Sequence, residues 1–266
     1  MDGLAENDHY TEIWQVEGAT DHYVWSMMRK RGVDEELITG DATNREKWTA
    51  MAEIFPEIAG NPTYEWVHLD LQRRFGIDTP ISAATADEIW VETKAQLQES
   101  DMRPQALLGE MNVEVVSSTD DPTSSLERHE QLAEDPDDVT VRPTRRPDTA
   151  MAIDAEGWSA YVDELGAATD TDVSDLDGFR AALETSHAYF DEPGCGASDH
   201  GVFEPVTGMV SDSRKLISFD SRFEMFRRSL ANSVGRMVER GQMPEDVAVD
   251  LVQRVAYDRP KDRWID

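Results

Sequence analysis

Two short runs rich in β-branched residues, 112–118 and 138–142, flank a helical segment at 124–134. Strand, loop, helix and strand in this order predict two parallel strands, because parallel neighbours need a long crossover and antiparallel neighbours do not. This pattern limits the fold more than any other feature of the sequence. We predict an α/β protein in which helices cover a parallel sheet.

The residues before this pattern are helical in character. Apolar side chains recur at helical spacing in four segments, 20–31, 43–55, 64–75 and 85–98. Further helices are predicted at 157–166, 175–190 and 223–240, and a short β-like step at 208–210. We therefore divide the chain into a mostly helical region, 1–108, and a β/α region with a C-terminal helix, 109–266.

Acidic side chains dominate the composition, with 55 Asp and Glu against 25 Lys and Arg and a net charge of -30. Such a surface repels phosphate backbones and anionic lipid headgroups, because binding to either depends on cationic side chains that release counterions. No apolar run approaches the roughly 20 residues that cross a bilayer, and residues 1–10 lack a basic, apolar leader. We expect a soluble protein with no nucleic-acid or membrane partner.

The choice of cations indicates a salt-rich environment. The chain has only five lysines, Lys30, Lys47, Lys94, Lys215 and Lys261, beside 20 arginines. Excess acid with few lysines is typical of proteins that stay soluble in concentrated salt, where self-repulsion is screened over about 3 Å at 1 M. The single cysteine, Cys195, cannot form an internal disulfide. We therefore expect a halophilic cytoplasm.

Several common catalytic motifs are absent from the sequence. It contains no Walker or Rossmann glycine loop, no Cys-x-x-Cys pair, no Gly-x-Ser-x-Gly turn and no His-Glu-x-x-His helix. We expect no nucleotide cofactor, no thiol redox chemistry and no serine hydrolysis.

Four polar clusters follow predicted strands or begin helices, where β/α proteins carry active sites. They are Thr119-Asp120-Asp121-Pro122, Arg145-Arg146-Pro147-Asp148, Ser198-Asp199-His200 and Ser211-Asp212-Ser213-Arg214. In one, Asp212 can place a carboxylate on a metal ion while Arg214 grips an anionic substrate. A capping aspartate paired with a structural arginine explains the same spacing. In a second, Pro147 holds Arg146 in an extended conformation, where it can bind a carboxylate or form a salt bridge to Asp148.

A third of these clusters, and a separate pair at a helix start, also have two interpretations each. Asp120 and Asp121 form an acidic pair suited to acid–base chemistry, or they cap the helix that starts near Ser124. His22 and Tyr23, at a helix start, contact hydroxyl groups of a polar ligand, or they pack as an ordinary aromatic pair.

Longer strings in the chain, taken in order, resemble the uronate isomerase (glucuronate isomerase) family of the amidohydrolase superfamily. The strings are Asp21-His22-Tyr23 with Trp25, Ile38-Thr39-Gly40-Asp41-Ala42, Arg45-Glu46-Lys47, Gly60-Asn61-Pro62, Ala86-Asp87-Glu88-Ile89-Trp90, Met111-Asn112-Val113, Thr119-Asp120-Asp121-Pro122, Arg146-Pro147-Asp148, Gly194-Cys195, Ser198-Asp199-His200, Asp212-Ser213-Arg214 and Phe226-Arg227-Arg228. Each string alone is weak, but their common order over nearly the whole chain indicates descent.

The resemblance implies a (β/α)8 barrel with a helical insertion over 1–108 and an aldose–ketose isomerase activity on hexuronates, such as D-glucuronate to D-fructuronate or D-galacturonate to D-tagaturonate. It implies that Asp212 is a catalytic base and a ligand of a divalent metal, zinc. Tyr23 is then catalytic, while His22, Arg146 and Arg214 bind the substrate. Moving a carbonyl between C1 and C2 needs such a base, and a cation to hold the carboxylate.

The chain departs from the family pattern in two places. It has no His-x-His pair, which in the family supplies two metal ligands. Only residues 201–208 connect His200 to Met209, where the family has several barrel strands. We therefore expect an incomplete barrel. The alternative function is that of an inactive, shortened member acting as an oligomerising or interaction protein, and a homo-oligomer is expected.

Overall fold

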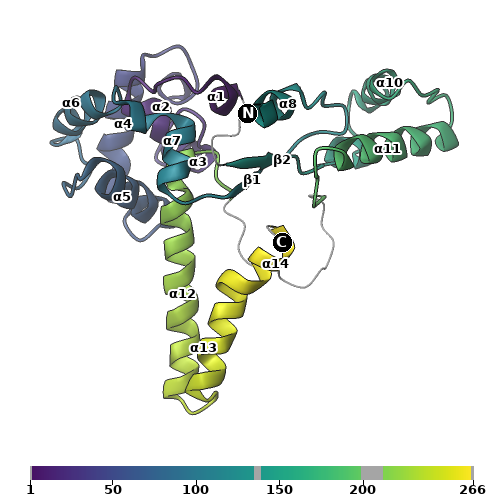
Figure 1. The fold of residues 1–266 in the computed structure, drawn as a ribbon. Helices are drawn as coiled ribbons and strands as arrows, with labels where there is room; N and C mark the ends of the chain where they lie inside the picture. The colour runs from purple at the N-terminus through teal and green to yellow at the C-terminus, as the bar shows by residue number, and fades with distance from the viewer. Residues whose placement is uncertain (1, 135–138, 199–211, 265–266) are drawn as a thin grey trace. The chain divides into compact units, whose positions relative to one another are not determined.

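The computed structural model describes residues 2–134, 139–198 and 212–264 (Figure 1). Contacts within the chain define two compact units. One consists of Met1–Glu6, Val113–Val206 and Asp262–Asp266, and the other of Asn7–Asn112 and Thr207–Lys261. We call the first the strand unit and the second the helical unit. No helix among the described residues is long and apolar enough to cross a membrane.

Short helices make up the N-terminal part of the helical unit. They are α2 (Ile13–Glu17), α3 (His22–Lys30), η1 (Glu35–Leu37), α4 (Asn44–Ile54), η2 (Phe55–Ile58), α5 (Pro62–Phe75), α6 (Ala86–Gln96), η3 (Ser100–Met102) and α7 (Pro104–Glu110). The four helices predicted from periodicity in this region are confirmed, with ends displaced by one or two residues.

Local side chains explain where these helices start and stop. The Asp21 carboxylate accepts the backbone N–H of Tyr23 at 2.8 Å at the start of α3. Thr43 and Glu46 form a reciprocal capping box before α4. Gly76 ends α5 with φ of 65°, a left-handed conformation that costs glycine little.

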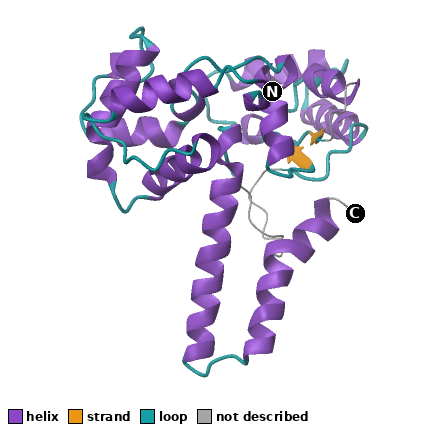
Figure 2. Cartoon of the chain, turned by 60° about the vertical axis from the view of Figure 1, so that its left-hand side comes forward, coloured by secondary structure: helices purple, strands orange, loops and turns teal. Residues whose placement is uncertain are grey.

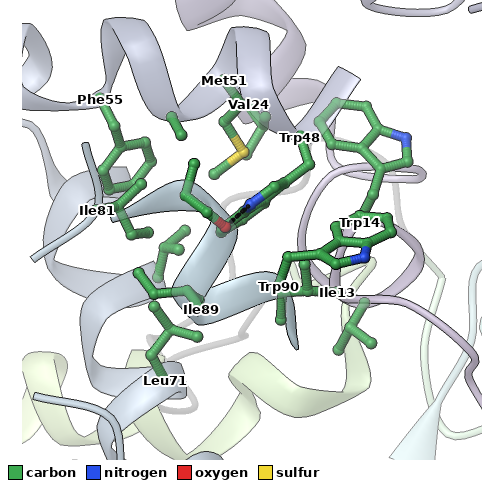
Figure 3. Close-up of a cluster of buried hydrophobic side chains, with 14 of the residues drawn as sticks. Ile13, Trp14, Val24, Trp48, Met51, Phe55, Leu71, Ile81, Ile89 and Trp90 are labelled. Carbon is green, nitrogen blue, oxygen red and sulfur yellow. Dashed lines mark hydrogen bonds between the residues drawn. The ribbon is translucent and has the colours of Figure 1, made fainter. Parts of the chain in front are cut away.

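Aromatic and aliphatic side chains from these helices form one core (Figure 3). Trp14, Trp48, Phe55, Leu71 and Ile89 are each at most 1% exposed. The Trp48 indole donates a hydrogen bond to the Ala86 carbonyl oxygen at 2.9 Å, so its one polar atom is satisfied inside the core. This packing fixes the surface on which the C-terminal part of the unit lies.

The C-terminal part adds η4 (Leu216–Ser218), α12 (Phe219–Glu239), α13 (Glu245–Gln253), the π-helical turn η5 (Arg254–Asp258) and α14 (Arg259–Trp264). Ile217 enters the core, at 1% exposure. Near its start α12 is bound to α5, where Arg74 pairs with Asp220 at 2.9 Å. The helix predicted at 223–240 is confirmed, but it begins four residues earlier, at Phe219.

A buried cluster of charges joins the two parts of the helical unit. The Lys215 ammonium lies 2.6 Å from Glu17, 3.4 Å from Asp21 and 3.7 Å from Asp70, and its side chain is fully buried. Arg222 lies 3.6 Å from Asp21. Because removing one member of a buried pair leaves a charge without a partner, the cluster holds the C-terminal segment to the helices before it.

The charges of this cluster balance when one carboxyl group is protonated. Burial raises the pKa of Glu17 to about 8, although Lys215 opposes this shift. Burial alone would lower the pKa of Lys215, but the nearby carboxylates outweigh burial and raise it. Burial also raises the pKa of Asp70, although Lys215 opposes this shift. Ser218 and Ser221 also donate hydrogen bonds to Asp70.

The strand unit contains the predicted parallel pair. Its elements are α1 (Asp2–Glu6), β1 (Val115–Ser117), α8 (Glu127–Glu134), β2 (Thr140–Arg142), α9 (Asp148–Met151), α10 (Trp158–Ala168) and α11 (Leu176–Asp191). Strands β1 and β2 pair in parallel with Val116 opposite Val141. Beyond the two strands, isolated parallel backbone bridges join Asp120 to Arg145 and Arg145 to Ser198.

The structure corrects the sequence prediction at the start of one helix. Helix α8 begins at Glu127, three residues after the predicted start at Ser124. The Asp121 carboxylate accepts the backbone N–H and the hydroxyl of Thr123, each at 3.0 Å. It therefore closes a turn before the helix and does not cap it. The β-like step predicted at 208–210 lies outside the described residues.

The Trp48 hydrogen bond generates a stability prediction. We expect Trp48→Phe to lower the free energy of unfolding by about 2 kcal/mol, because it removes a buried hydrogen bond and leaves a cavity. Trp158→Phe is the control, since its indole also donates to a carbonyl oxygen, that of Ala150 at 3.0 Å, but is partly exposed. Urea unfolding at fixed salt measures both. Equal losses would contradict the assigned role of burial.

The raised pKa of Glu17 generates a prediction of pH dependence. Its pKa of about 8 in the folded protein exceeds its ordinary value of 4.5, so the folded state binds the proton more tightly. The contribution of Glu17 to the free energy of unfolding is therefore largest at low pH and is lost as the pH rises through about 8. We expect Glu17→Gln to flatten this decline and to unfold at higher urea concentration than wild type above pH 8.

The measurement is urea unfolding over a pH series at constant salt. Glu92→Gln is the matched control, because Glu92 is exposed on α6. The control variant should keep the wild-type slope. Identical slopes for wild type and Glu17→Gln would show that Glu17 is already ionised in the folded protein.

Candidate functional site

Two of the predicted catalytic residues meet in the helical unit, although 189 positions separate them in the sequence. The Tyr23 hydroxyl donates a hydrogen bond to Asp212 Oδ2 at 2.8 Å. This hydrogen bond, with some burial, raises the pKa of Tyr23. The phenol therefore stays protonated at neutral pH, and the pair combines a carboxylate with a neutral proton donor.

Arg222 holds the backbone of Asp212 in place. Its Nη1 donates to the Asp212 carbonyl oxygen at 2.8 Å. Asp212 has a φ of 45°, in the left-handed region that aspartate tolerates better than most residues. The Arg222 side chain is buried and also contacts Asp21, a member of the buried charge cluster. The position of the Asp212 carboxylate thus depends on that cluster.

Aromatic rings surround the Tyr23 side chain. The ring of His22 lies 4.1 Å from that of Tyr23, and Trp66 meets Tyr23 edge-on at 5.9 Å. The Arg222 guanidinium lies over the Trp66 ring at 4.3 Å, a cation–π contact. His22 Nδ1 is buried without a hydrogen-bond partner among the described residues. The ring packing expected of His22 and Tyr23 is therefore present, together with an unused imidazole nitrogen.

The two predicted substrate-binding arginines belong to different units. Arg214 is exposed in the helical unit, two residues after Asp212, and its carbonyl oxygen accepts a hydrogen bond from Thr20 at 3.4 Å. Arg146 lies in the strand unit, where its Nε donates to Asp148 at 2.7 Å. The salt bridge to Asp148 that the sequence allowed is confirmed. The side chain of Arg146 remains 52% exposed.

Polar side chains also gather where β1 and β2 end. Ser118 Oγ lies 2.5 Å from Asp120 Oδ2 and 2.7 Å from His129 Nε2. Since the hydroxyl has one proton to give to Asp120, the imidazole donates to the hydroxyl. Burial lowers the pKa of His129, which favours the neutral ring. The chain of hydrogen bonds ties α8 to the end of β1.

The second acid of this cluster is also engaged. Asp121 accepts the Tyr161 hydroxyl at 3.0 Å, and burial raises the pKa of Tyr161. Arg145 is buried nearby, and burial lowers its pKa. Because Asp120 and Asp121 both accept structural hydrogen bonds, the described contacts support a role in holding the strand ends together.

The described residues do not assemble a metal centre. No group of three or more His, Cys, Asp or Glu side chains suited to a metal ion occurs among them. Asp212 offers a carboxylate, but its Oδ2 already accepts the Tyr23 hydroxyl. Zinc sites in proteins have three or four protein ligands. The donor set in the described part of the chain therefore does not fit a zinc ion.

Sequence reasoning missed the residues that hold the site together. Lys215, Arg222, Glu17 and Asp70 carry the buried charge cluster, and none was among the candidates. One signal was present, because Lys215 is one of five lysines and lies next to the apolar pair Leu216 and Ile217. Lysine is usually exposed and is almost never fully buried unless it is paired, so this signal alone did not predict a buried ion pair.

Comparison with known proteins confirms the resemblance. The model of the glucuronate isomerase family matches residues 1–207 and, separately, residues 201–264. The two matches meet at 201–207, inside the short connection between His200 and Met209. This break is consistent with the expectation that a middle portion of the family is absent here.

Named relatives agree with the family match. Uronate isomerase of Thermotoga petrophila is 53% identical, and that of Thermotoga maritima 36%, each over 411 aligned positions that cover 97% of this chain and 91% of the relative. Because this chain has 266 residues, at least 145 of the 411 positions have no counterpart in it.

A solved structure agrees as well. The crystal structure of Thermotoga maritima uronate isomerase superposes with a TM-score of 0.92 at 34% identity, and the match covers 99% of this chain and 92% of that one. The ordered motifs, the two family matches and this superposition lead to one conclusion. The chain belongs to the glucuronate isomerase, or uronate isomerase, family.

Proposed function

We propose that this chain is an aldose–ketose isomerase that acts on hexuronates, converting D-glucuronate to D-fructuronate or D-galacturonate to D-tagaturonate in sugar-acid catabolism. The observation that carries the proposal is the hydrogen-bonded pair of Tyr23 and Asp212, in a chain of this family. A carboxylate beside a protonated phenol is suited to moving protons between neighbouring atoms of a sugar.

In the proposed reaction, the Asp212 carboxylate removes the proton from C2 of the aldouronate. The Tyr23 hydroxyl gives a proton to the carbonyl oxygen at C1. The sugar is then a neutral enediol, Asp212 is protonated and Tyr23 is a phenolate. Asp212 then returns its proton to C1, and the C2 hydroxyl proton restores Tyr23 as the ketone forms. Base and acid are both regenerated, so no oxidant or reductant is consumed.

Cationic side chains hold the substrate in this proposal. Arg214 follows the Asp212 site by two residues, and Arg146 follows a predicted strand. Guanidinium groups bind carboxylates through two parallel hydrogen bonds, so either arginine suits the uronate carboxylate. His22 completes the set through its unused nitrogen, Nδ1, which can bind a sugar hydroxyl.

The proposal includes the fold and setting that the family resemblance implies. The parallel pair of strands and the bridge from Arg145 to Ser198 support part of a (β/α)8 barrel over 109–266, with residues 1–108 as a helical insertion. Net charge -30 supports a salt-rich cytoplasm. The resemblance implies a divalent metal such as zinc at Asp212, but the donor set in the described part of the chain does not fit one, and no step above passes through a metal.

A specific observation favours a second candidate function. At least 145 aligned family positions are missing, and the described residues do not complete a metal site. An inactive member that acts as an oligomerising or interaction protein fits these facts. Metal content and turnover separate the two candidates.

The activity test measures ketouronate formation by wild type and variants in concentrated KCl, with and without added zinc. We expect Asp212→Asn to lower kcat by about 10² to 10⁴-fold, because it removes the base but keeps the shape of the side chain. Asp246→Asn, an exposed aspartate at the start of α13, is the control and should match wild type. A folded wild type without turnover would reject the isomerase proposal.

Zinc content provides an independent test. Because the described residues offer Asp212 without a complete ligand set, we expect less than one zinc per chain after purification and dialysis against zinc. Elemental analysis measures this content. One tightly bound zinc per chain, lost in Asp212→Asn and retained in Asp246→Asn, would show that the donor set is complete after all.

A further inference from the structure

Three polar side chains of the strand unit form a continuous set of hydrogen bonds where β1 ends. They are His129 from α8, and Ser118 and Asp120 from the segment after β1. His129 Nε2 donates to Ser118 Oγ at 2.7 Å, and the hydroxyl donates to Asp120 Oδ2 at 2.5 Å. Strands β1 and β2, arrows in Figure 1 and orange in Figure 2, lead into this set, which we call the Ser118 network. None of its members takes part in the reaction proposed above.

The direction of each hydrogen bond in the Ser118 network is fixed. The side chains of His129 and Asp120 are only 3% and 12% exposed. His129 Nδ1 is buried without a hydrogen-bond partner among the described residues, so a proton at Nδ1 would have no acceptor. The ring therefore carries its proton on Nε2, and Ser118 Oγ accepts it. Since a hydroxyl has one proton to give, every member has one defined role.

The backbone of Asp120 connects this network to Arg146. The Asp120 N–H donates to the Thr144 carbonyl oxygen at 2.9 Å, and the Asp120 carbonyl oxygen accepts the Arg146 N–H at 2.8 Å. Because Pro147 has no backbone N–H, the chain leaves this pairing after Arg146, and α9 begins at Asp148. Arg146 is therefore held by Asp120 at the point where the chain turns away, and a shift of Asp120 moves Arg146.

Arg146 is one of the two cations that the proposed function assigns to the substrate carboxylate, so the inference rests on that function. Its side chain is 52% exposed, and its Nε donates to Asp148 at 2.7 Å. A guanidinium binds a carboxylate through two parallel N–H groups, which requires a defined orientation. A displacement of about 1 Å at a group that positions a substrate can cost about 100-fold in rate.

The chemistry of the network suits positioning better than simple attachment of α8. Apolar side chains alone would hold α8 against β2 without burying an imidazole and a carboxylate, which is costly unless both are hydrogen-bonded. Hydrogen bonds also fix direction, because they tolerate only a narrow range of distances and angles. A buried, fully connected set of them gives the Asp120 side chain one position.

We propose that His129 and Ser118 are positioning residues for Arg146. Through the Asp120 side chain they fix the backbone that holds the arginine, so that its guanidinium meets the carboxylate of a hexuronate. This carboxylate lies at the far end of the sugar from C1 and C2, so its contact is equally strong in the ground state and the transition state. Loss of the network should therefore raise KM and leave kcat nearly unchanged.

The first test needs no substrate. Nitrogen-15 NMR in concentrated KCl follows the backbone N–H and Nε–H resonances of Arg146 in wild type and variants. The amide nitrogen of glutamine reaches the place of Nε2, whereas that of asparagine reaches only the place of Nδ1. We expect both resonances to shift in His129→Asn and to stay at their wild-type positions in His129→Gln. His187→Asn, the same change at an exposed histidine of α11, is the matched control and should shift neither resonance.

A second variant guards against loss of folding. Ser118→Ala breaks the network at its centre and should reproduce the shifts of His129→Asn, while circular dichroism checks that each variant is folded. Unmoved Arg146 resonances in the folded variants would overturn the proposal.

The second test measures the Kd of D-glucuronate and of D-galacturonate by calorimetry. We expect His129→Asn to raise the Kd of the bound sugar acid about tenfold, with His129→Gln and His187→Asn within about twofold of wild type. In an Arg146→Gln background, His129→Asn should raise Kd no further, because both substitutions remove the same contact. In the turnover assay His129→Asn should raise KM and keep kcat, in contrast to Asp212→Asn.

The two tests separate failure of the inference from failure of the proposed function. A full tenfold loss from His129→Asn in the Arg146→Gln background would overturn the inference, since His129 would then act without Arg146. A wild type that binds neither sugar acid would reject the proposed function. The Arg146 resonances would still decide whether the Ser118 network positions the arginine.

Discussion

The buried ammonium group of Lys215 holds the helical unit together. It meets carboxylates from α2, from the residue before α3 and from α5, while Lys215 itself lies 198 residues after Glu17. An ammonium group leaves water only where such partners are already in place, because an unpaired buried charge costs several kcal/mol. The C-terminal segment therefore has one favourable position on the N-terminal helices, and Ile217 enters the core there.

The candidate site is a consequence of that attachment. Asp212 lies three residues before Lys215, and Arg222, which contacts the same cluster, donates to the Asp212 carbonyl oxygen. Tyr23 follows Asp21, a cluster member and the cap of α3. Both partners of the Tyr23–Asp212 hydrogen bond are thus fixed by residues of the buried cluster that lie two to ten positions away in the sequence. A site assembled from distant segments gains its precision from this rigid support.

The acidic composition of the chain has two consequences. The excess of acidic side chains keeps the protein dispersed in salt. The same excess repels an anionic sugar acid, so local arginines must hold such a substrate.

Much of this protein follows from the sequence by itself. Helical periodicity predicted the helices around Trp48, Leu71 and Ile89, and β-branched runs predicted the parallel strands, because both depend on patterns within a dozen residues. The order of short motifs identified the family, and with it Tyr23, Asp212 and Arg146. Only the tertiary structure revealed that Lys215 and Arg222 support the site. It also showed that Asp121 closes a turn before α8 and does not cap that helix. Those roles depend on partners that local spacing cannot reveal, since burial and ion pairing are decided by which distant segments pack together.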